Sequence, residues 1–253
     1  MSTRSTSNKK NAEIIGVFSK AIYLECDRKV LVIHDSSWGY VPFGIAEDNI
    51  EEFIRNGDFE VGKSIEVTLP QRKKAATVSK LTLSRKRIEE TEKIISESGS
   101  KDGIIGYYNS LPRVKTAVDS LFSALTEGKD ATLYAIKLIG LGRGLTPSGD
   151  DFLAGMFYLF GMANADFSRL ATSVKENISR TSKISGAYLC AVLENEHFTI
   201  YEHSSLALLG NDSVRAHTDF VLPLGASSGT DTLCGALFAA KVLERLNKNR
   251  LLG

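Results

Sequence analysis

The spacing of apolar residues changes near residue 86, and this change most strongly limits what the chain can fold into. Before that point, short apolar runs separated by turn residues predict strands. After it, apolar residues recur at the spacing of a helix that buries one face. We therefore predict an α+β protein, with a small N-terminal β-sheet or barrel domain followed by a mostly α-helical domain.

The predicted elements divide the chain into three segments. The expected strands are EIIGVF, AIYLEC, KVLVIH, GYVPF, SIEVTL and ATVSKLTL, with a hairpin turn at Asp27-Arg28-Lys29 and a short helix over residues 47–55. The expected helices of the second half cover residues 87–96, 114–126, 131–139, 151–163 and 232–246. The segments are a polar, disordered tail over 1–11, a β-rich domain over 12–86 and a helical domain over 87–253.

Charge and composition exclude several kinds of partner. The formal net charge is +1, so no overall field selects nucleic acid or an anionic membrane. The polar N-terminus has no apolar core of a secretory signal, and the longest apolar stretch, residues 152–163, is shorter than the roughly 20 residues that cross a bilayer. Three widely separated cysteines suit a reducing compartment. We expect a cytoplasmic protein without membrane association.

One octapeptide occurs twice. SGDDFLAG at Ser148–Gly155 and SGTDTLCG at Ser228–Gly235 both follow the pattern S-G-x-D-x-L-x-G, with an offset of 80 residues from Ser148 to Ser228. Each copy is typical of a loop that turns into a helix, because Ser caps helices and Asp suits the helix start. Two unrelated helix starts would share this composition. If the copies face each other, their unpaired amide groups converge on one cavity, whose natural guest is a phosphate or carboxylate.

A glycine-rich loop, Gly140-Leu-Gly-Arg-Gly144, precedes the first copy. Its alternating glycines permit positive φ angles and a close approach of the backbone to a ligand. Arg143 offers a planar fork for a carboxylate or phosphate, although a solvated loop arginine is an equal alternative. Either Thr146 or Ser148 is the expected helix cap.

Three aspartates complicate an anion site, because carboxylates repel anions unless a cation or a proton intervenes. Asp150, Asp151 and Asp231 could accept hydrogen bonds from a substrate amide, hold a divalent ion or complete the helix caps. Capping accounts easily for one of them and less well for all three. We take them as the candidate catalytic residues. No metal ligands are assigned and the cofactor is unknown, with a divalent metal left open.

Other motifs are interpreted as structural. Gly57–Ser64 matches the GxxxxGK[ST] phosphate-loop pattern, but a charged helix precedes it and a strand follows, so we expect a turn. The basic runs Arg72–Lys74 and Arg85–Arg87 lack interleaved aromatic residues, and nucleic acid is not an expected partner. Four histidines show no recognised metal-ligand spacing, and we expect surface or core roles for His34, His197, His203 and His217.

The segment GLGRGLTPSGDDFLAG resembles the G-L-G-x-G-L-T-P-S-G-D-D-F-L-A-G signature of the family that includes the AllH subunit of oxamate carbamoyltransferase. TSKISGAYL from Thr181 and GASSGTDTLCG from Gly225 resemble the same family. Arg143 stands where proline is expected, and Ala226 where the second loop often carries a bulkier polar residue. The resemblance implies a small anionic metabolite of the oxamate or carbamoyl phosphate class and companion subunits. Thr181 and Ser185 are candidate site residues through this resemblance alone.

These observations give one candidate site and competing functions for it. The candidate ligand-binding residues are Gly142, Arg143, Gly144, Thr146, Ser148, Gly149, Thr181, Ser185, Ser227, Ser228 and Gly229. The first hypothesis is a carbamoyltransferase-type subunit that holds a small anionic metabolite at paired helix N-termini. The alternative is a non-catalytic anion-binding or regulatory protein that uses the same cavity. A third hypothesis, an RNA-associated protein working through its β half, predicts binding that falls steeply with salt.

Overall fold

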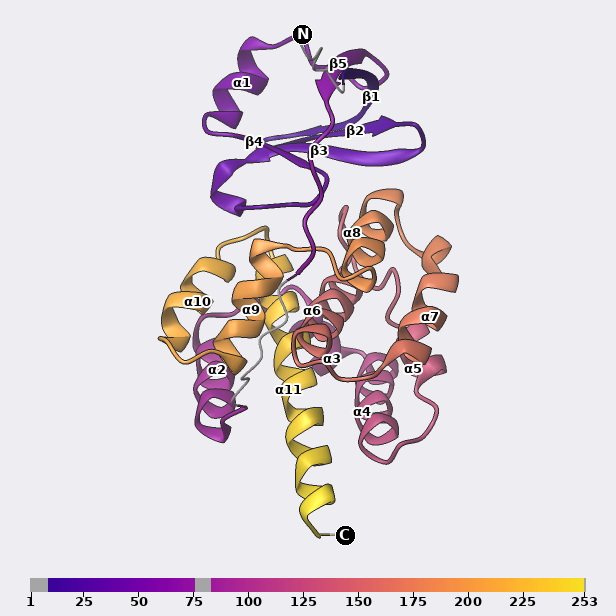
Figure 1. Cartoon of the computed structure of the whole chain (residues 1–253), viewed down its shortest axis with the longest axis vertical. Coiled ribbons are helices and arrows are strands. Elements are labelled where there is room, and N and C mark those ends of the chain that lie inside the picture. Colours follow the sequence, from indigo (N-terminus) through magenta and orange to yellow (C-terminus); the bar gives the residue numbers. More distant parts are fainter. Residues whose placement is uncertain (1–8, 76–82, 253) are drawn as a thin grey trace, which may run out of the picture. The chain divides into compact units, whose positions relative to one another are not determined.

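The chain divides into two compact units. The computed structural model describes residues 9–75 and 83–252. The first unit comprises the residues up to Lys74 and the short stretch His197–Thr199, and the second comprises Ala75–Glu196 and the residues from Ile200 onward. Strands belong to the first unit and most helices to the second, which confirms the predicted α+β class (Figure 1).

A curled sheet with strand order β4-β3-β2-β1-β5 forms the first unit. The strands are β1 (Lys9–Phe18), β2 (Ala21–Cys26), β3 (Lys29–Asp35), β4 (Gly44–Glu47) and β5 (Ser64–Thr68), and the helices are η1 (Ser36–Trp38) and α1 (Ile50–Asn56). Pairing is antiparallel except between β3 and β4. The pairing of β1 with β2 shifts between Ile14 and Gly16, and an irregularity of this kind bends a strand.

The predicted hairpin between β2 and β3 is confirmed. Asp27 and Arg28 both have positive φ, at 49° and 63°, which a two-residue turn between twisted antiparallel strands requires. Asp tolerates this conformation because its short polar side chain can hydrogen-bond locally. The strands that the hairpin joins bury Ile22, Leu24 and Val32 completely.

Two expectations for the first unit are corrected. GYVPF is not a strand, because Pro42 lacks a backbone N–H and Gly39 has φ of 71°, and β4 begins only at Gly44. Residues 9–11 are not a tail, since β1 begins at Lys9 and pairs with β5. Residues 1–8 of the expected tail lie outside the described residues. The segment resembling a phosphate loop joins α1 to β5, as predicted.

The division between the units falls after Lys74, earlier than the expected position after residue 86. Ala75 already donates a backbone hydrogen bond to Asn195 of the second unit, at 2.9 Å. Most of the expected strand over 76–83 lies outside the described residues. Apolar alternation predicts strands but does not reveal which unit a connecting segment joins, and this explains the displaced boundary.

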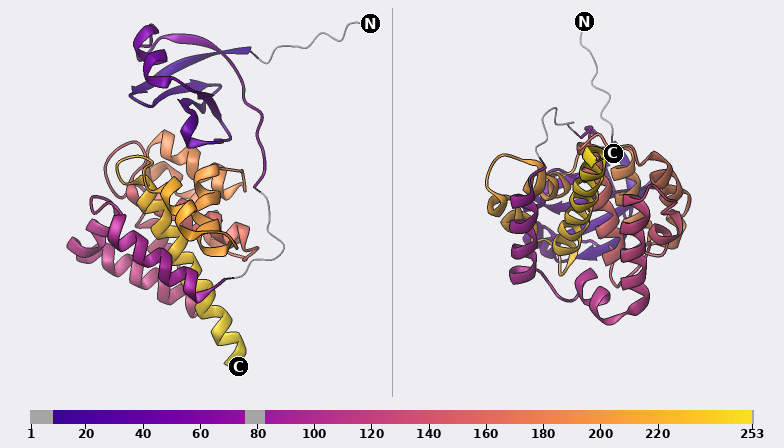
Figure 2. Two further views of the ribbon diagram at one scale, coloured as in Figure 1. Left: turned by 90° about the vertical axis from the view of Figure 1, so that its left-hand side faces the viewer. Right: turned by 90° about the horizontal axis from the view of Figure 1, so that it is seen from below.

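The second unit is a bundle of helices around one buried helix, α6. Its helices are α2 (Arg85–Ser98), α3 (Ile104–Ser110), α4 (Pro112–Thr126), α5 (Thr132–Ile136), α6 (Ser148–Met162), α7 (Ser168–Glu176), η2 (Ile178–Arg180), α8 (Lys183–Leu193), α9 (Thr199–Leu209), α10 (Val214–Val221) and α11 (Ser228–Leu252). The long α11 packs along α6, and α2 and α4 lie on either side of α11 (Figure 2).

Helix α6 is buried on nearly all sides because it carries no charged residue after its first turn. Leu153, Met156 and Leu159 are completely buried, and so are Leu233 and Ala236 of α11. A helix that is apolar all round belongs in the core of a bundle. None of the helices within residues 9–75 and 83–252 combines the length and apolarity needed to span a membrane.

Candidate functional site

Both copies of the octapeptide begin a helix of the second unit. The first copy forms the start of α6 and the second forms the start of α11. The N–H of Gly149 donates to the carbonyl of Leu141 at 2.8 Å, and that of Gly229 donates to Leu224 at 2.9 Å. The two copies therefore have the same local structure. Both glycine amides are used within the protein, so the structure does not support Gly149 and Gly229 as ligand donors.

The structural repeat extends upstream of the octapeptides, where sequence comparison did not reveal it. Gly142 and Gly225 have positive φ, at 119° and 67°, and each lies against the serine that begins its own helix. The first loop runs from Gly142 to Ser148 and the second from Gly225 to Ser228, so the first is three residues longer. This length difference changes the offset between the copies and hides their relation in the sequence.

Two glycines let α6 and α11 cross at close range. A Cβ atom on Gly155 would overlap the carbonyl group of Thr232, and one on Gly235 would overlap the carbonyl group of Phe152. Thr232 and Phe152 occupy the same position of the octapeptide in the two copies. The last glycine of each copy therefore contacts the fifth residue of the other. The crossing brings the two helix starts to one side of the helix pair, as the duplicated pattern predicts.

The two helix starts are also joined by a hydrogen bond between side chains. The Thr146 and Ser228 hydroxyl oxygens lie 3.1 Å apart. A hydrogen bond from Ser228 lowers the pKa of Asp151, and one from Ser148 lowers the pKa of Asp231, in both cases against the larger effect of burial. Each aspartate therefore lies near the serine that begins the other helix. The convergence of the two copies is observed.

Asp150 ties the first loop to the segment that precedes α8. Its carboxylate accepts hydrogen bonds from Gly140 N at 2.8 Å, from Ser185 Oγ at 2.7 Å and from Thr181 Oγ1. Burial raises the pKa of Asp150, and these three donors oppose the rise. Thr181 and Ser185, which entered the candidate site only through resemblance, contact Asp150. Asp150 thus has partners within the protein and acts as a positioning residue.

Asp231 has a similar structural role at the start of α11. Its carboxylate accepts from Ile104 N at 2.6 Å and from Ser227 Oγ at 2.9 Å. Burial raises its pKa, and the hydrogen bond from Ile104 opposes this most strongly. Gly103 lies directly against the carboxylate, where a Cβ atom would overlap it. The sequence predicted a loop around Gly103, and the glycines of that loop were the one sign that another group could approach its backbone closely.

Asp151 differs from its two neighbours. It is buried, and its Oδ2 atom has no hydrogen-bond partner among the described residues. Burial raises the pKa of Asp151 well above its ordinary value; the Ser228 hydroxyl lowers it, and the nearby charges of Asp231 and Asp150 raise it further. These effects favour the neutral carboxyl, which does not repel an anion and has a proton to donate.

The first loop presents donors to solvent. Arg143 and Gly144 are exposed, and Gly142 is half-buried. The backbone N–H groups of these three residues donate no hydrogen bond to any described residue. Gly144 has φ of 93°, a conformation that favours glycine. Exposed amides beside an arginine form a site that can accept an oxyanion.

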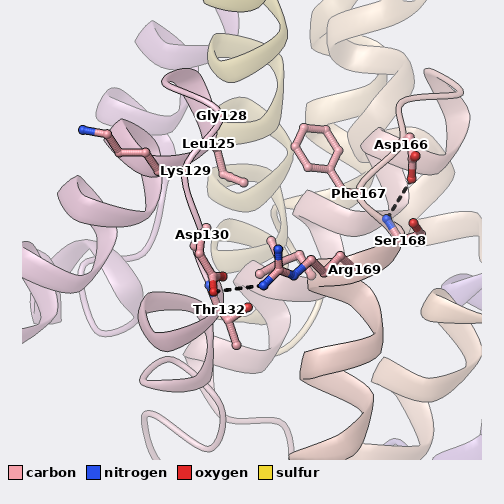
Figure 3. Close-up of a pocket in the computed structure, with 11 residues that line it drawn as sticks. Leu125, Gly128, Lys129, Asp130, Thr132, Asp166, Phe167, Ser168 and Arg169 are labelled. Atoms are coloured by element: carbon pink, nitrogen blue, oxygen red, sulfur yellow. Dashed lines mark hydrogen bonds and ion pairs between the residues drawn. The ribbon is translucent and has the colours of Figure 1, made fainter.

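A separate cavity of about 280 Å³ lies elsewhere in the second unit (Figure 3). Arg169 and Asp130 form an ion pair of 3.4 Å at its edge, and Asp166 accepts from the Ser168 backbone at 3.1 Å. None of the candidate site residues lines this cavity. No group of three or more His, Cys, Asp and Glu side chains within residues 9–75 and 83–252 is arranged to hold a metal ion.

Comparison with known proteins agrees with the signature around Gly140. Residues 138–240 match the family model described as oxamate carbamoyltransferase subunit AllH. The matched segment contains both glycine loops and the starts of α6 and α11. No solved structure gives a significant match to the chain. Over residues 138–240, the chain is therefore similar to the AllH family.

Proposed function

We propose that this chain is a subunit of a carbamoyltransferase-type enzyme acting on a small anionic metabolite of the oxamate or carbamoyl phosphate class. The ligand binds at the paired starts of α6 and α11, and the enzyme includes companion subunits. The family description supports the reaction and the companions. One structural observation supports the binding site: two duplicated helix starts lie together, with exposed amides on one loop and a buried carboxyl group that has an unpartnered oxygen.

The proposed reaction transfers a carbamoyl group to oxamate. The oxamate nitrogen forms a bond to the carbamoyl carbon, the carbon–oxygen bond to phosphate breaks, and the phosphate leaves with the electron pair and takes up the nitrogen's proton. Negative charge therefore moves onto the phosphate oxygens in the transition state. Donors that already point at these oxygens stabilise this charge without having to reorganise.

Each residue has a specific role in this proposal. The amides of Gly142 and Gly144 donate to phosphate oxygens, and Arg143 pairs with a carboxylate or phosphate through its planar guanidinium. Asp151 in its neutral form donates a hydrogen bond to a ligand oxygen, which an ionised carboxylate could not do. Asp150 and Asp231 hold the loops, because their oxygens already accept from protein donors.

The binding site is tested by titrating phosphate and oxamate into the purified chain by calorimetry. We expect Arg143→Ala to weaken anion binding about 10- to 100-fold, since a hydrogen bond to a charged group contributes about 1.5–3 kcal/mol. Arg169→Ala, which removes an exposed arginine beside the separate cavity, is the matched control and should bind as the wild type does. Equal affinities for all three proteins would reject the site.

The reaction is tested with the same variants together with candidate companion subunits. Phosphate release from carbamoyl phosphate should depend on oxamate and should fall when Asp151 is replaced by Asn. The alternative, a non-catalytic binding or regulatory protein, is favoured by the observation that Asp150 and Asp231 are engaged within the protein. It predicts anion binding without turnover even when the companions are present.

A further inference from the structure

Helices α9 and α10 bring two histidines together outside the site described above. The Nδ1 atoms of His203 and His217 lie 3.2 Å apart, and the two rings are inclined at 74°. His217 Nε2 lies 2.9 Å from Asp212 Oδ1. His217 is buried, His203 is half-buried, and the Asp212 side chain is exposed. The sequence did not indicate that these two histidines lie together, because their spacing along the chain matches no recognised metal-ligand motif.

The carboxylate of Asp212 determines which nitrogen of His217 carries the proton. A carboxylate only accepts hydrogen bonds, so His217 donates from Nε2, and in the neutral ring its Nδ1 then holds a lone pair. That lone pair is directed at Nδ1 of His203. The two Nδ1 atoms can share one proton between them or, in its place, bind one cation that lies beside the line joining them.

The separation of the nitrogens fits a metal ion. Zinc–nitrogen bonds of about 2.0–2.1 Å in tetrahedral geometry place two ligand nitrogens roughly 3.3–3.4 Å apart. The observed Nδ1–Nδ1 distance of 3.2 Å is slightly shorter than this, and a small rotation of the rings would make up the difference.

The surrounding residues hold the pair in place. Metal-binding histidines commonly donate their second ring nitrogen to a carboxylate, which orients the ring and makes it more basic, and Asp212 occupies that position. Arg87 donates to the Asp212 carbonyl at 2.6 Å and to the Leu206 carbonyl at 2.7 Å, so it fixes the turn between α9 and α10. Phe220 stacks on His203, with ring centroids 4.3 Å apart.

We propose that His203 and His217 bind one divalent transition-metal ion of the Zn²⁺ class through their Nδ1 atoms, with Asp212 as a positioning residue. Neutral imidazole is a ligand that suits Zn²⁺, Ni²⁺ and Cu²⁺. Two protein ligands leave the remaining coordination positions to water. This site is independent of the proposed carbamoyltransferase function, because it shares no residue with the glycine loops.

Calorimetric titration of the full chain with ZnCl₂ at pH 7.5 tests the proposal. The wild type should bind one equivalent, His203→Ala and His217→Ala should each abolish that binding, and Asp212→Asn should weaken it about 10- to 100-fold. His197→Ala removes a histidine of the first unit and should bind as the wild type does. Retention of zinc binding in both cluster variants, or no binding by the wild type, would overturn the site.

A spectroscopic measurement keeps the test valid if the variant at buried His217 fails to fold. His203 is half-buried and is the safer substitution, and far-ultraviolet circular dichroism reports whether the variant retains its helices. Electron paramagnetic resonance of the wild type with one equivalent of Cu²⁺ should show coupling to two imidazole nitrogens, and the His203→Ala variant under the same conditions should lose this two-nitrogen pattern. A spectrum without nitrogen coupling, or one unchanged in His203→Ala, would contradict the proposal.

Discussion

Alanine at either glycine of the α6–α11 crossing should destabilise the protein, although alanine is the better helix former. A Cβ atom at Gly235 would lie 2.7 Å from the Phe152 carbonyl carbon, and one at Gly155 would lie 2.9 Å from that of Thr232. Both distances are about 1 Å shorter than the 3.5–4.0 Å that two carbon atoms prefer. The obstructing atoms belong to the backbone of a buried helix, so the two helices must separate.

The expected loss follows from two opposing effects. Overpacking a core costs about 1–3 kcal/mol, and a backbone clash places these variants at the upper end. The higher helix propensity of alanine recovers about 1 kcal/mol. We therefore expect Gly155→Ala and Gly235→Ala each to lower the free energy of unfolding by about 2 kcal/mol, and the melting temperature by about 4–8 °C for a chain of this size.

Urea unfolding followed by circular dichroism at 222 nm measures this effect. Gly186→Ala in α8 is the matched control: it is also a buried helical glycine, but the nearest atom to its Cβ would belong to the Ile178 side chain, at 3.3 Å. We expect this control to stay within about 1 kcal/mol of the wild type. In the double variant of Gly155 and Gly235, the loss should be smaller than the sum of the two, because one separation relieves both clashes. If both single variants are as stable as Gly186→Ala, the inference that α6 and α11 cross at close range is wrong.

Two further predictions concern the buried aspartates. Asp150→Ala leaves three donors without their acceptor and should lower the free energy of urea unfolding by about 3–5 kcal/mol, whereas Asp166→Ala, at an exposed helix start, should cost about 1 kcal/mol or less. Asp151 has a raised pKa in the folded state, so it contributes stability below pH 3.8, and this contribution is lost as the pH rises through the folded pKa. As the pH rises from 4, the melting temperature of the wild type should therefore fall relative to that of Asp151→Asn. Parallel curves of melting temperature against pH for the two proteins would contradict the raised pKa of Asp151.

Much of the fold could be predicted from the period of the apolar residues. The change from strands to helices is correct, and so is the turn at Asp27 and Arg28, because each depends on local chemistry. The ends of elements were less accurate: α6 begins at Ser148, three residues before the prediction. The first helical turn contains Ser, Gly and Asp, which are typical of caps as well as of helix starts. The stretch His197–Thr199 joins the first unit through contacts that no local pattern encodes.

The candidate site was predictable to the extent that it repeats. The octapeptide pattern indicated two similar helix starts, and the structure brings them together. The partners of Asp150 and Asp231 could not be predicted in the same way. Gly140 and Ile104 contribute backbone N–H groups, and a backbone group has no signature in a sequence. The sequence made all three aspartates candidate catalytic residues, and the structure gives Asp150 and Asp231 partners within the protein while Asp151 keeps an oxygen without a partner among the described residues.

The departures from the repeat indicate which copy carries the chemistry. At the third position of the octapeptide, Asp150 accepts from Gly140 N, and its counterpart Thr230 accepts from Ser100 N, so both fix a neighbouring loop. At the fourth position the copies differ. Asp231 accepts from a backbone amide and a hydroxyl, whereas Asp151 retains an oxygen without a partner among the described residues. The three additional loop residues also belong to the first copy. A buried, unpartnered carboxyl oxygen destabilises a fold unless a ligand uses it. Under the proposed function, we therefore expect the first copy to supply most of the ligand contacts and the second copy to act mainly as scaffold.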